Sequence, residues 1–345
     1  MPSHSLHAEI LEQPAALQRV IDAYTGPAGR ERWAQLRAGG ARPVLVGMGA
    51  SYHSALLGTH FLERQGLAAT AHEATDLLQA EHSPVLQQAS ALVYVSQSGA
   101  SGEVLPLLER LAPGTPIIAL TNDEHSPLAQ RAHRVLPLYA GEEQTVASKT
   151  YVNTVALLWL LAARWSGAAD DRADRALVAA HARIVGLLAQ GEALAQRWVR
   201  QLGAAKPLIF LGSGAQAVTA RQCAMTAMEW LKAPALSASV GAFRHGPLEI
   251  VEPGVGAVVF AAPGPAYAST LRLAEELDRY GATVLLVESG QTRALDEPAT
   301  EDTDFEAALA PLVDVVPVQL FVEALARERG LPGEFRHITK VTTHV

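Results

Sequence analysis

Short, continuous apolar runs alternate with helical patterns along most of this sequence. In the first half, four such runs, which we interpret as strands, start at Pro43, Ala91, Pro116 and Arg134. Helix-like sequence lies between and after them, over residues 50–65, 104–111 and 146–165. Strands of a parallel sheet read as unbroken apolar runs because helices cover both of its faces. The pattern therefore predicts an α/β domain with a doubly wound sheet.

The second half repeats this order of elements. Four further runs are interpreted as strands and start at Pro207, Ala257, Thr283 and Val313, the last spanning Val313–Val316. Residues 43–50 end in Gly-Met-Gly-Ala and residues 207–215 in Gly-Ser-Gly-Ala, each before a helix. Glycine-ended strands occur in any α/β protein, but the matching element order favours a duplicated domain.

Helical patterns fill the remaining segments. Residues 9–24 carry apolar side chains at helical spacing, Gly26-Pro27 ends that helix, and a second helix runs to Gly39-Gly40. Residues 170–202 lack proline and predict one long connecting helix. The predicted organisation is N-terminal helices at 1–38, a first domain at 39–168, a connecting helix at 169–203, a second domain at 204–332 and a tail at 333–345.

Composition agrees with an ordered two-domain protein. The chain has 345 residues, of which 49% are hydrophobic and 18% charged, enough to bury two ordinary cores. Its net charge is −8, and the lysines and arginines are scattered, so we expect no nucleic-acid partner. A small anion could still bind where local donors gather.

Cellular location is suggested by three negative features. Cys223 is the one cysteine, so no internal disulfide can form and a reducing compartment is expected. Its apolar surroundings favour a small hydrophobe over a reactive thiol. The N-terminus lacks the basic and apolar regions of a signal peptide, and we identify no apolar run approaching the ~20 residues of a membrane span. The expectation is a cytoplasmic protein.

Three loops of the first half follow predicted strands, where ligands bind in open parallel sheets. They are residues 47–54, 96–102 and 121–125. The second, Ser-Gln-Ser-Gly-Ala-Ser-Gly, offers hydroxyls, small residues and a following helix N-terminus, which together suit a phosphate. An ordinary turn with an N-cap is the alternative. The P-loop lysine is absent, and Gly47-Met-Gly lacks the third glycine of a dinucleotide fingerprint.

Other candidates for chemistry lie far apart in the sequence. His245 precedes Gly-Pro in a loop, Glu229 interrupts an apolar helical segment, and Lys340 lies among hydroxyl and apolar residues of the tail. Each has a plain alternative, since loop histidines are often only exposed and a helix glutamate often only faces solvent. Their spacing alone does not unite them.

Together these segments resemble the isomerase half of glucosamine-6-phosphate synthase and related deaminases and isomerases, which consist of two sugar isomerase (SIS) domains. The likeness covers nearly the whole chain. It rests on the opening 9–14, the turn 47–53, the Ser96-Gln-Ser-Gly loop, the run 141–148, Arg244-His-Gly-Pro and the lysine-bearing tail.

The resemblance implies roles for particular residues. The phosphate and nearby hydroxyls of a sugar phosphate would be held by Gly49, Ser51, Ser96, Gln97, Ser98 and Ser101, and Val146 and Ala147 would line the sugar. Glu229 would move a proton between C1 and C2. His245 would help open the ring from the neighbouring subunit of a homodimer, and Lys340 would form a Schiff base with the open-chain ketose. No metal or organic cofactor is implied.

The match also has departures. Thr226 and Ala242 replace a lysine and a glutamate found in relatives, Lys149 lies one place early, and no glutaminase domain precedes the match, so no glutaminase activity is expected. The function expected is an aminosugar-6-phosphate deaminase or ketose–aldose isomerase of the glucosamine-6-phosphate/fructose-6-phosphate type, acting through an open-chain enolamine or enediol. A sugar-amine-6-phosphate deglycase and a non-catalytic sugar-phosphate sensor remain alternatives.

Overall fold

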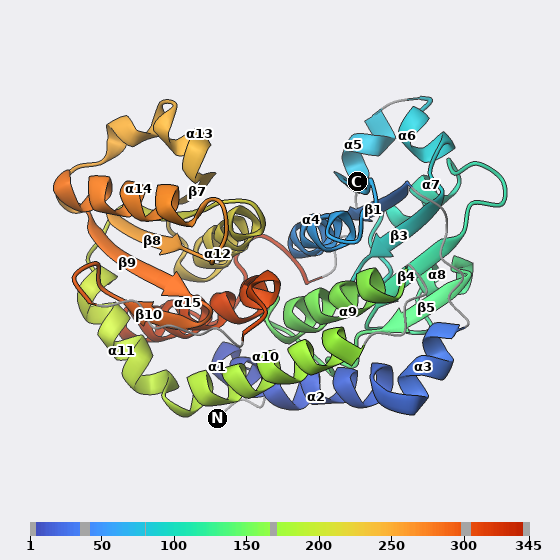
Figure 1. Ribbon diagram of the computed structural model, residues 1–345, viewed down its shortest axis with the longest axis horizontal. Helices are drawn as coiled ribbons and strands as arrows, with labels where there is room; N and C mark the ends of the chain where they lie inside the picture. The colour runs from blue at the N-terminus through green and yellow to red at the C-terminus, as the bar shows by residue number, and fades with distance from the viewer. Residues whose placement is uncertain (1–4, 35–41, 80, 166–170, 298–304, 341–345) are drawn as a thin grey trace. The chain divides into compact units, whose positions relative to one another are not determined.

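The structure is a computed structural model that describes residues 5–34, 42–79, 81–165, 171–297 and 305–340 (Figure 1). Contacts between residues divide the chain into two units, each built on one sheet. The first-sheet unit comprises residues 12–177 and 336–345, and the second-sheet unit comprises residues 1–11 and 178–335. Residues 336–340 of the tail thus pack with the first-sheet unit, although they follow the second sheet along the chain.

Five parallel strands form the first sheet in the order β2-β1-β3-β4-β5. They are β1 Pro43–Gly47, β2 Thr70–Glu73, β3 Ala91–Val95, β4 Ile117–Thr121 and β5 Arg134–Pro137. All residues of β1, β3 and β4 are buried, as the apolar runs predicted. Strand β2 was not predicted, because its Thr-Ala-His-Glu sequence is polar and lies at the half-exposed edge.

The second sheet has the same strand order, β7-β6-β8-β9-β10, with β10 antiparallel. Its strands are β6 Leu208–Gly212, β7 Ala235–Ser239, β8 Gly256–Phe260, β9 Thr283–Glu288 and β10 Gln291–Arg293. In both sheets the first strand in sequence pairs with the second and the third, and the chain then proceeds to the far edge. The shared order agrees with the predicted repetition of elements.

Helices cover both faces of each sheet (Figure 1). In the first-sheet unit they are α2 Gln13–Tyr24, α3 Gly26–Ala34, α4 Ala50–Glu63, α5 Ala74–Gln79, α6 Pro84–Gln87, α7 Val104–Leu108, α8 Pro127–Arg131 and α9 Lys149–Trp165. Helices α5 to α8 pack on one face, and α4 and α9 lie on the other, where Gly58 lets α4 approach Leu45 and Leu158. The α/β fold class is therefore confirmed.

The second-sheet unit has the corresponding layers. It contains α1 Leu6–Leu11, α11 Gly191–Leu202, α12 Ala215–Leu231, α13 Val240–Arg244, α14 Tyr267–Arg279 and α15 Ala310–Glu328, with short 3-10 turns η1 Pro247–Ile250 and η2 Ala307–Leu309. Helix α10, Asp171–Ala189, crosses from one unit into the other. Helices α13 and α14 pack on one face of the sheet, and α12 and α15 pack together.

The predicted strand Val313–Val316 is wrong, because these residues lie inside helix α15. A short apolar run does not distinguish a buried strand from a helix that is buried on all sides. The expectation that no apolar segment reaches the length of a membrane span is also wrong. Residues 307–328 contain an 18-residue window of mean hydropathy 1.7, and 89% of that window is buried within the structure.

Two segments that were predicted as single helices each contain two helices in the structure. The segment 9–24 divides at Glu12, and α2 starts with Pro14 near its N-terminus. The connecting segment 170–202 divides at Gln190 into α10 and α11. The predicted stop at Gly39-Gly40 lies outside the described residues, and the bounds of the five predicted segments stay a prediction.

The two glycine turns that end β1 and β6 have nearly identical backbones. Gly49 has φ 52° and ψ −124°, and Gly214 has φ 57° and ψ −127°, a conformation that only glycine adopts easily. A Cβ on Gly47 would lie 2.6 Å from the carbonyl carbon of Ser51, and one on Gly212 would lie 2.4 Å from the carbonyl oxygen of Gln216. Each strand end therefore requires glycine so that the following helix can approach closely.

We expect Gly47→Ala to lower the free energy of unfolding by about 1–3 kcal/mol, because the new methyl group overlaps backbone atoms. Gly186→Ala is the control: this helical glycine has open space around it, so alanine should stabilise by about 0.5–1 kcal/mol. Urea unfolding followed by circular dichroism measures both. Equal shifts in the two variants would contradict the close approach at Gly47.

Candidate functional site

Hydrogen bonds within the serine-rich loop after β3 fix its shape. The Ser96 hydroxyl accepts from the Gly99 amide at 3.1 Å, and the Ser98 hydroxyl accepts from the Ala100 amide at 3.3 Å. Gly99 has φ 60°, and a Cβ there would lie 2.1 Å from the Ser126 hydroxyl. The loop is thus fixed in shape, while Ser98 remains partly exposed to a ligand.

Loops after neighbouring strands lie side by side at the carboxyl edge of the first sheet. Strand register pairs Val46 of β1 with Tyr94 of β3, so both strands end at the same level. The turn carrying Gly49 and Ser51 follows β1, and Ser51 lies in the first turn of α4. The predicted phosphate-binding residues are therefore carried on adjacent strand ends, beside the N-terminus of a 14-residue helix.

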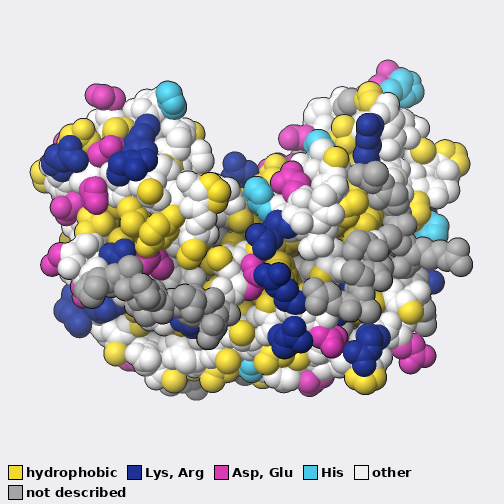
Figure 2. Space-filling model, viewed as in Figure 1, with side chains coloured by type: hydrophobic (Ala, Val, Ile, Leu, Met, Phe, Trp, Pro, Cys, Tyr) yellow, Lys and Arg dark blue, Asp and Glu magenta, His cyan; other side chains and the backbone are white. Residues whose placement is uncertain are grey.

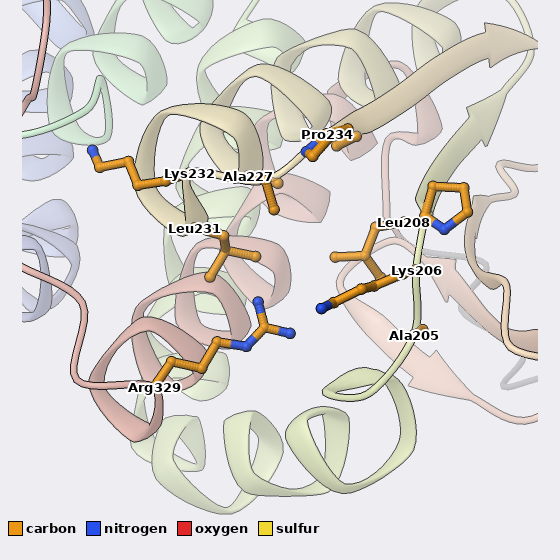
Figure 3. Close-up of a pocket in the computed structure, with 11 residues that line it drawn as sticks. Ala205, Lys206, Leu208, Ala227, Leu231, Lys232, Pro234 and Arg329 are labelled. Carbon is orange, nitrogen blue, oxygen red and sulfur yellow. The ribbon is translucent and has the colours of Figure 1, made fainter.

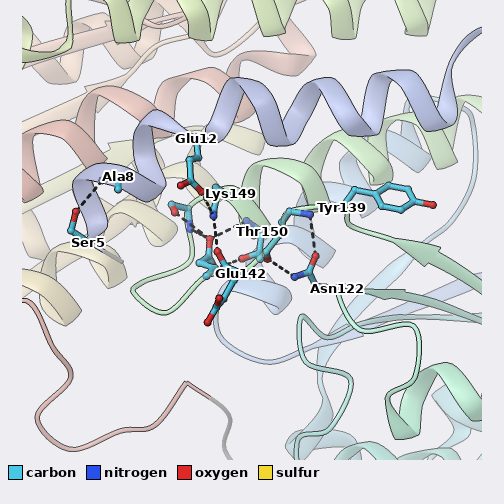
Figure 4. A network of polar contacts seen from close by, with 12 residues as sticks. Ser5, Ala8, Glu12, Asn122, Tyr139, Glu142, Lys149 and Thr150 are labelled. Carbon is cyan, nitrogen blue, oxygen red and sulfur yellow. Dashed lines mark hydrogen bonds and ion pairs between the residues drawn. The ribbon is translucent and has the colours of Figure 1, made fainter. Parts of the chain in front are cut away.

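Asn122 joins the serine loop to the loop after β5. Its amide N–H donates to the Gln97 carbonyl at 2.9 Å, and its side-chain nitrogen donates to the Gly141 carbonyl at 2.7 Å. Its side-chain oxygen accepts from the Ala140 amide at 3.0 Å (Figure 4). Sequence reasoning did not select Asn122, although it lies in the third loop considered.

Glu143 organises the segment that contains Val146 and Ala147. Its carboxylate is completely buried and accepts hydrogen bonds from both the amide and the hydroxyl of Ser148, at 3.0 and 3.1 Å. It also accepts from the amide and the hydroxyl of Thr150, at 3.1 and 2.5 Å. These bonds fold residues 143–148 into a compact turn, so α9 starts three residues later than predicted.

The tail lysine completes this cluster. The Lys340 ammonium lies 2.9 Å from Glu143 Oε2 and 2.5 Å from the Thr145 carbonyl oxygen. Burial alone would raise the pKa of Glu143, but the charge of Lys340 and the hydrogen bonds from Thr150 and Ser148 hold this pKa below its usual value. The tail is thus bound beside Val146 and Ala147 by an ion pair. Glu143 itself was not selected from the sequence as a site residue.

Lys149, the lysine that departs from the family pattern, is part of the scaffold. Its side chain is 2% exposed, and its ammonium lies 2.5 Å from Glu12 Oε2 and 2.6 Å from the Glu142 carbonyl (Figure 4). It therefore joins the start of α9 to the start of α2 and has no freedom to reach a ligand.

Glu229 and His245 belong to the second-sheet unit. Glu229 is half-buried in the last turn of α12, where its carbonyl accepts from the Lys232 ammonium. His245 is exposed at the end of α13, after Arg244, which pairs with Glu276 at 3.0 Å. The structure thus places Lys340, Val146 and the serine loops within one unit, whereas the meeting of Glu229 and His245 with them stays a prediction.

The carboxyl edge of the second sheet lacks the corresponding hydroxyls. Gln216 occupies the helix position of Ser51 and donates to the buried Asp314 carboxylate at 2.5 Å, and the Gly290 amide also donates to Asp314. The segment after β8, Ala261-Ala-Pro-Gly, replaces Ser-Gln-Ser-Gly. A buried carboxyl group beside the helix start, with no Ser-Gln-Ser-Gly loop after β8, does not suit an anion, so the first unit carries the candidate phosphate site.

Cys223 is nearly completely buried, in helix α12. Burial raises the pKa of its thiol well above the usual value, and the nearby Asp314 adds to this. A thiol that stays protonated is a poor nucleophile, which agrees with the prediction of a small hydrophobe.

Asp314 is also a source of pH-dependent stability. Burial raises its pKa to about 7, against the opposing hydrogen bonds from Gly290 and Gln216. Between about pH 4 and pH 7 the folded protein therefore holds a proton that the unfolded chain has released, so the free energy of unfolding falls as the pH rises. In Asp314→Asn, the decrease in the free energy of unfolding between pH 4 and pH 7 should be smaller than in the wild type, by on the order of 2–4 kcal/mol.

Urea unfolding of the wild type and Asp314→Asn at several pH values measures the difference. The matched control is Asp278→Asn on the exposed side of α14, which should leave the profile unchanged. A profile for Asp314→Asn that parallels the wild type would show that this carboxyl group is not protonated preferentially in the folded state.

The fold and the serine loop define an α/β protein with a candidate anion site at one sheet edge, and comparison with known proteins places it more narrowly. Residues 40–164 match the family model of the SIS domain. This segment contains the whole first sheet, the serine loop and the Glu143 turn.

Similarity to known proteins extends beyond that domain. The isomerizing glutamine–fructose-6-phosphate aminotransferase of Gloeobacter violaceus is 29% identical over 99% of this chain, which spans 58% of that relative's length. The C-terminal domain of glucosamine-fructose-6-phosphate aminotransferase from Francisella tularensis matches with a TM-score of 0.83, 20% identity and coverage of 96% of this chain and 98% of that one. Glucosamine-6-phosphate deaminase from Thermotoga maritima matches with a TM-score of 0.77, 22% identity and coverage of 97% and 98%. The two solved structures are similar in fold.

Proposed function

We propose that this protein is a phosphosugar enzyme that deaminates or isomerises an aminosugar 6-phosphate or ketose 6-phosphate. The observation that carries the proposal is a continuous set of contacts along the carboxyl edge of the SIS domain. It runs from the Ser96 loop through Asn122 and the turn of Glu143 to Lys340. These contacts support an arrangement in which the serine loop would bind phosphate and the amine would react, as an enzyme that anchors one end of a sugar and reacts at the other requires.

The serines would hold the phosphate group. Small residues and hydroxyls of the loop, together with the N-terminus of α4, favour a dianion without a lysine. The names of the Gloeobacter and Thermotoga relatives refer to fructose 6-phosphate and glucosamine 6-phosphate, which supports this substrate class. Binding energy from the phosphate would then orient the open-chain sugar.

Lys340 would react with the sugar carbonyl. Its amine condenses with C2 of the open-chain ketose and releases water, and the resulting iminium acidifies the C1–H bond. Only the uncharged amine can attack a carbonyl, so this lysine must give up a proton before it reacts. Glu229 would carry the proton between C1 and C2, and His245 would assist ring opening from the partner subunit of a homodimer.

Other features of the proposal follow from the similarity along the chain. Residues 204–332 would form a second SIS domain, since the second sheet repeats the strand order of the first. The protein would act in the cytoplasm. Basic side chains on the face drawn in Figure 2 lie in small groups beside acidic ones, which supports a small-molecule partner over nucleic acid.

Lys340→Arg provides the sharpest test of the chemistry. Arginine keeps a positive charge opposite Glu143 but forms no Schiff base, so ammonia release or ketose formation from glucosamine 6-phosphate should fall by roughly 10³-fold or more. The melting temperature should stay near that of the wild type. Borohydride added during turnover should trap a sugar adduct on the wild type, seen by intact mass, and none on Lys340→Arg.

Lys340→Met is the companion variant, because it removes both the amine and the charge that pairs with Glu143. It should be as inactive as Lys340→Arg and also less stable. Near-normal turnover in Lys340→Arg would show that this lysine only anchors the tail and forms no Schiff base. Binding of the phosphosugar without turnover by the wild type would favour the non-catalytic sensor.

A further inference from the structure

A cavity of about 400 Å³ lies in the second-sheet unit (Figure 3). Leu208 and Ala235, two of its lining residues, are the first residues of β6 and β7. The cavity therefore opens at the amino edge of the second sheet. It is separated from the glycine turn at Gly212 by the length of a five-residue strand, roughly 16 Å. The cavity thus lies at the carboxyl edge of neither sheet. The sugar chemistry proposed above takes place at the carboxyl edge of the first sheet.

The lining has an uneven chemical composition. Eight of the lining residues are apolar: Ala205, Pro207, Leu208, Ala227, Leu231, Ala233, Pro234 and Ala235. The other three are cationic, Lys206, Lys232 and Arg329, and none of the described residues that line the cavity is acidic. Apolar walls with a few placed charges are typical of sites for small organic ligands, and the volume lies in the usual range of about 300–1,000 Å³.

Two of the three cations face the cavity. Figure 3 shows the side chains of Lys206 and Arg329 directed into the space bordered by Leu208 and Leu231, whereas Lys232 extends away from it. The Lys232 ammonium donates to the Glu229 carbonyl and lies 5.6 Å from the Trp230 ring centre. It is therefore engaged outside the cavity.

Lys206 and Arg329 have N–H groups that can donate hydrogen bonds to a ligand. Among the described residues, no hydrogen bond or ion pair is recorded for the Lys206 ammonium. Arg329 Nη2 donates to the Gly203 carbonyl at 2.7 Å, and a guanidinium has further N–H groups beyond that one. Helix α15 ends beside Arg329 and places a partial negative charge there, but two full positive charges outweigh it.

We propose that this cavity binds a small organic anion with an apolar body. A carboxylate or phosphomonoester would contact Lys206 and Arg329, and the apolar group would lie between Leu208 and Leu231. Such a ligand would be distinct in chemistry from a sugar phosphate, because the described residues of the lining offer the body of the ligand no hydroxyl or amide side chain.

Isothermal titration of the full chain with three probes tests this site. The probes are 3-phenylpropionate, phenyl phosphate and the neutral 3-phenylpropanol. We expect saturable binding of at least one anion, with the alcohol at least tenfold weaker. Preference between the two anions distinguishes a carboxylate site from a phosphate site.

Variants locate the binding. Lys206→Gln and Arg329→Gln change exposed side chains and should each weaken the anion about tenfold, because each removes a charge-assisted hydrogen bond. Arg200→Gln, an exposed cation of α11 outside the cavity, should change nothing. Ser98→Ala should leave the binding of 3-phenylpropionate, which carries no phosphate, intact; this separates the cavity from the serine loop.

Two results would overturn the proposal. One is the absence of saturable binding by either anion at about 10 mM, a concentration that detects even weak sites. The other is binding that is equally strong in the wild type, Lys206→Gln and Arg329→Gln. Neither result would bear on the phosphosugar function, whose site lies in the other unit.

Discussion

The buried carboxylate of Glu143 is the interaction on which the candidate site depends. A charge removed from water costs several kcal/mol unless donors replace the water. Four hydrogen bonds from Ser148 and Thr150 and the ammonium of Lys340 supply them. The same contacts fold the turn around Val146 and Ala147, start helix α9 and bind the C-terminal tail to the first-sheet unit. One carboxylate thus connects local structure to the position of the proposed reactive amine.

The two sheets share a strand order but differ in what they present at their carboxyl edges. Both first strands end in a glycine turn of the same backbone geometry, since each must admit a helix closely. After that turn the first unit offers Ser51, and the second offers Gln216, which is committed to the buried Asp314. The same strand order therefore carries different side chains at the two carboxyl edges.

Much of this architecture could be predicted from the sequence. The strands beginning at Pro43, Ala91 and Pro207 were evident because central parallel strands are apolar throughout. Strands β2, β7 and β10 were not predicted: β2 is polar, β10 has three residues, and most of β7 is not buried. The segment Val313–Val316 was predicted as a strand but lies in a helix, because a helix packed on all sides is as apolar as a central strand.

For the site, the sequence indicated the groups that contact a ligand better than the groups that hold them. The Ser96 loop has a recognisable composition and position, and the tail lysine was identified by resemblance. Glu143 and Asn122 were not selected, because their importance lies in partners distant along the chain. Nothing in local spacing relates Glu143 to a lysine 197 positions later.

The most direct test of the central claim is equilibrium binding of fructose 6-phosphate, with fructose as the matched ligand that lacks only the phosphate. Thermal unfolding should show stabilisation of about 2.7 kcal/mol by the phosphosugar at a hundred times its dissociation constant, and none by fructose at the same concentration. Ser98→Ala should reduce the stabilisation by the phosphosugar. Equal effects of the two sugars, or no effect of the phosphosugar, would contradict a phosphate-binding site in the SIS domain.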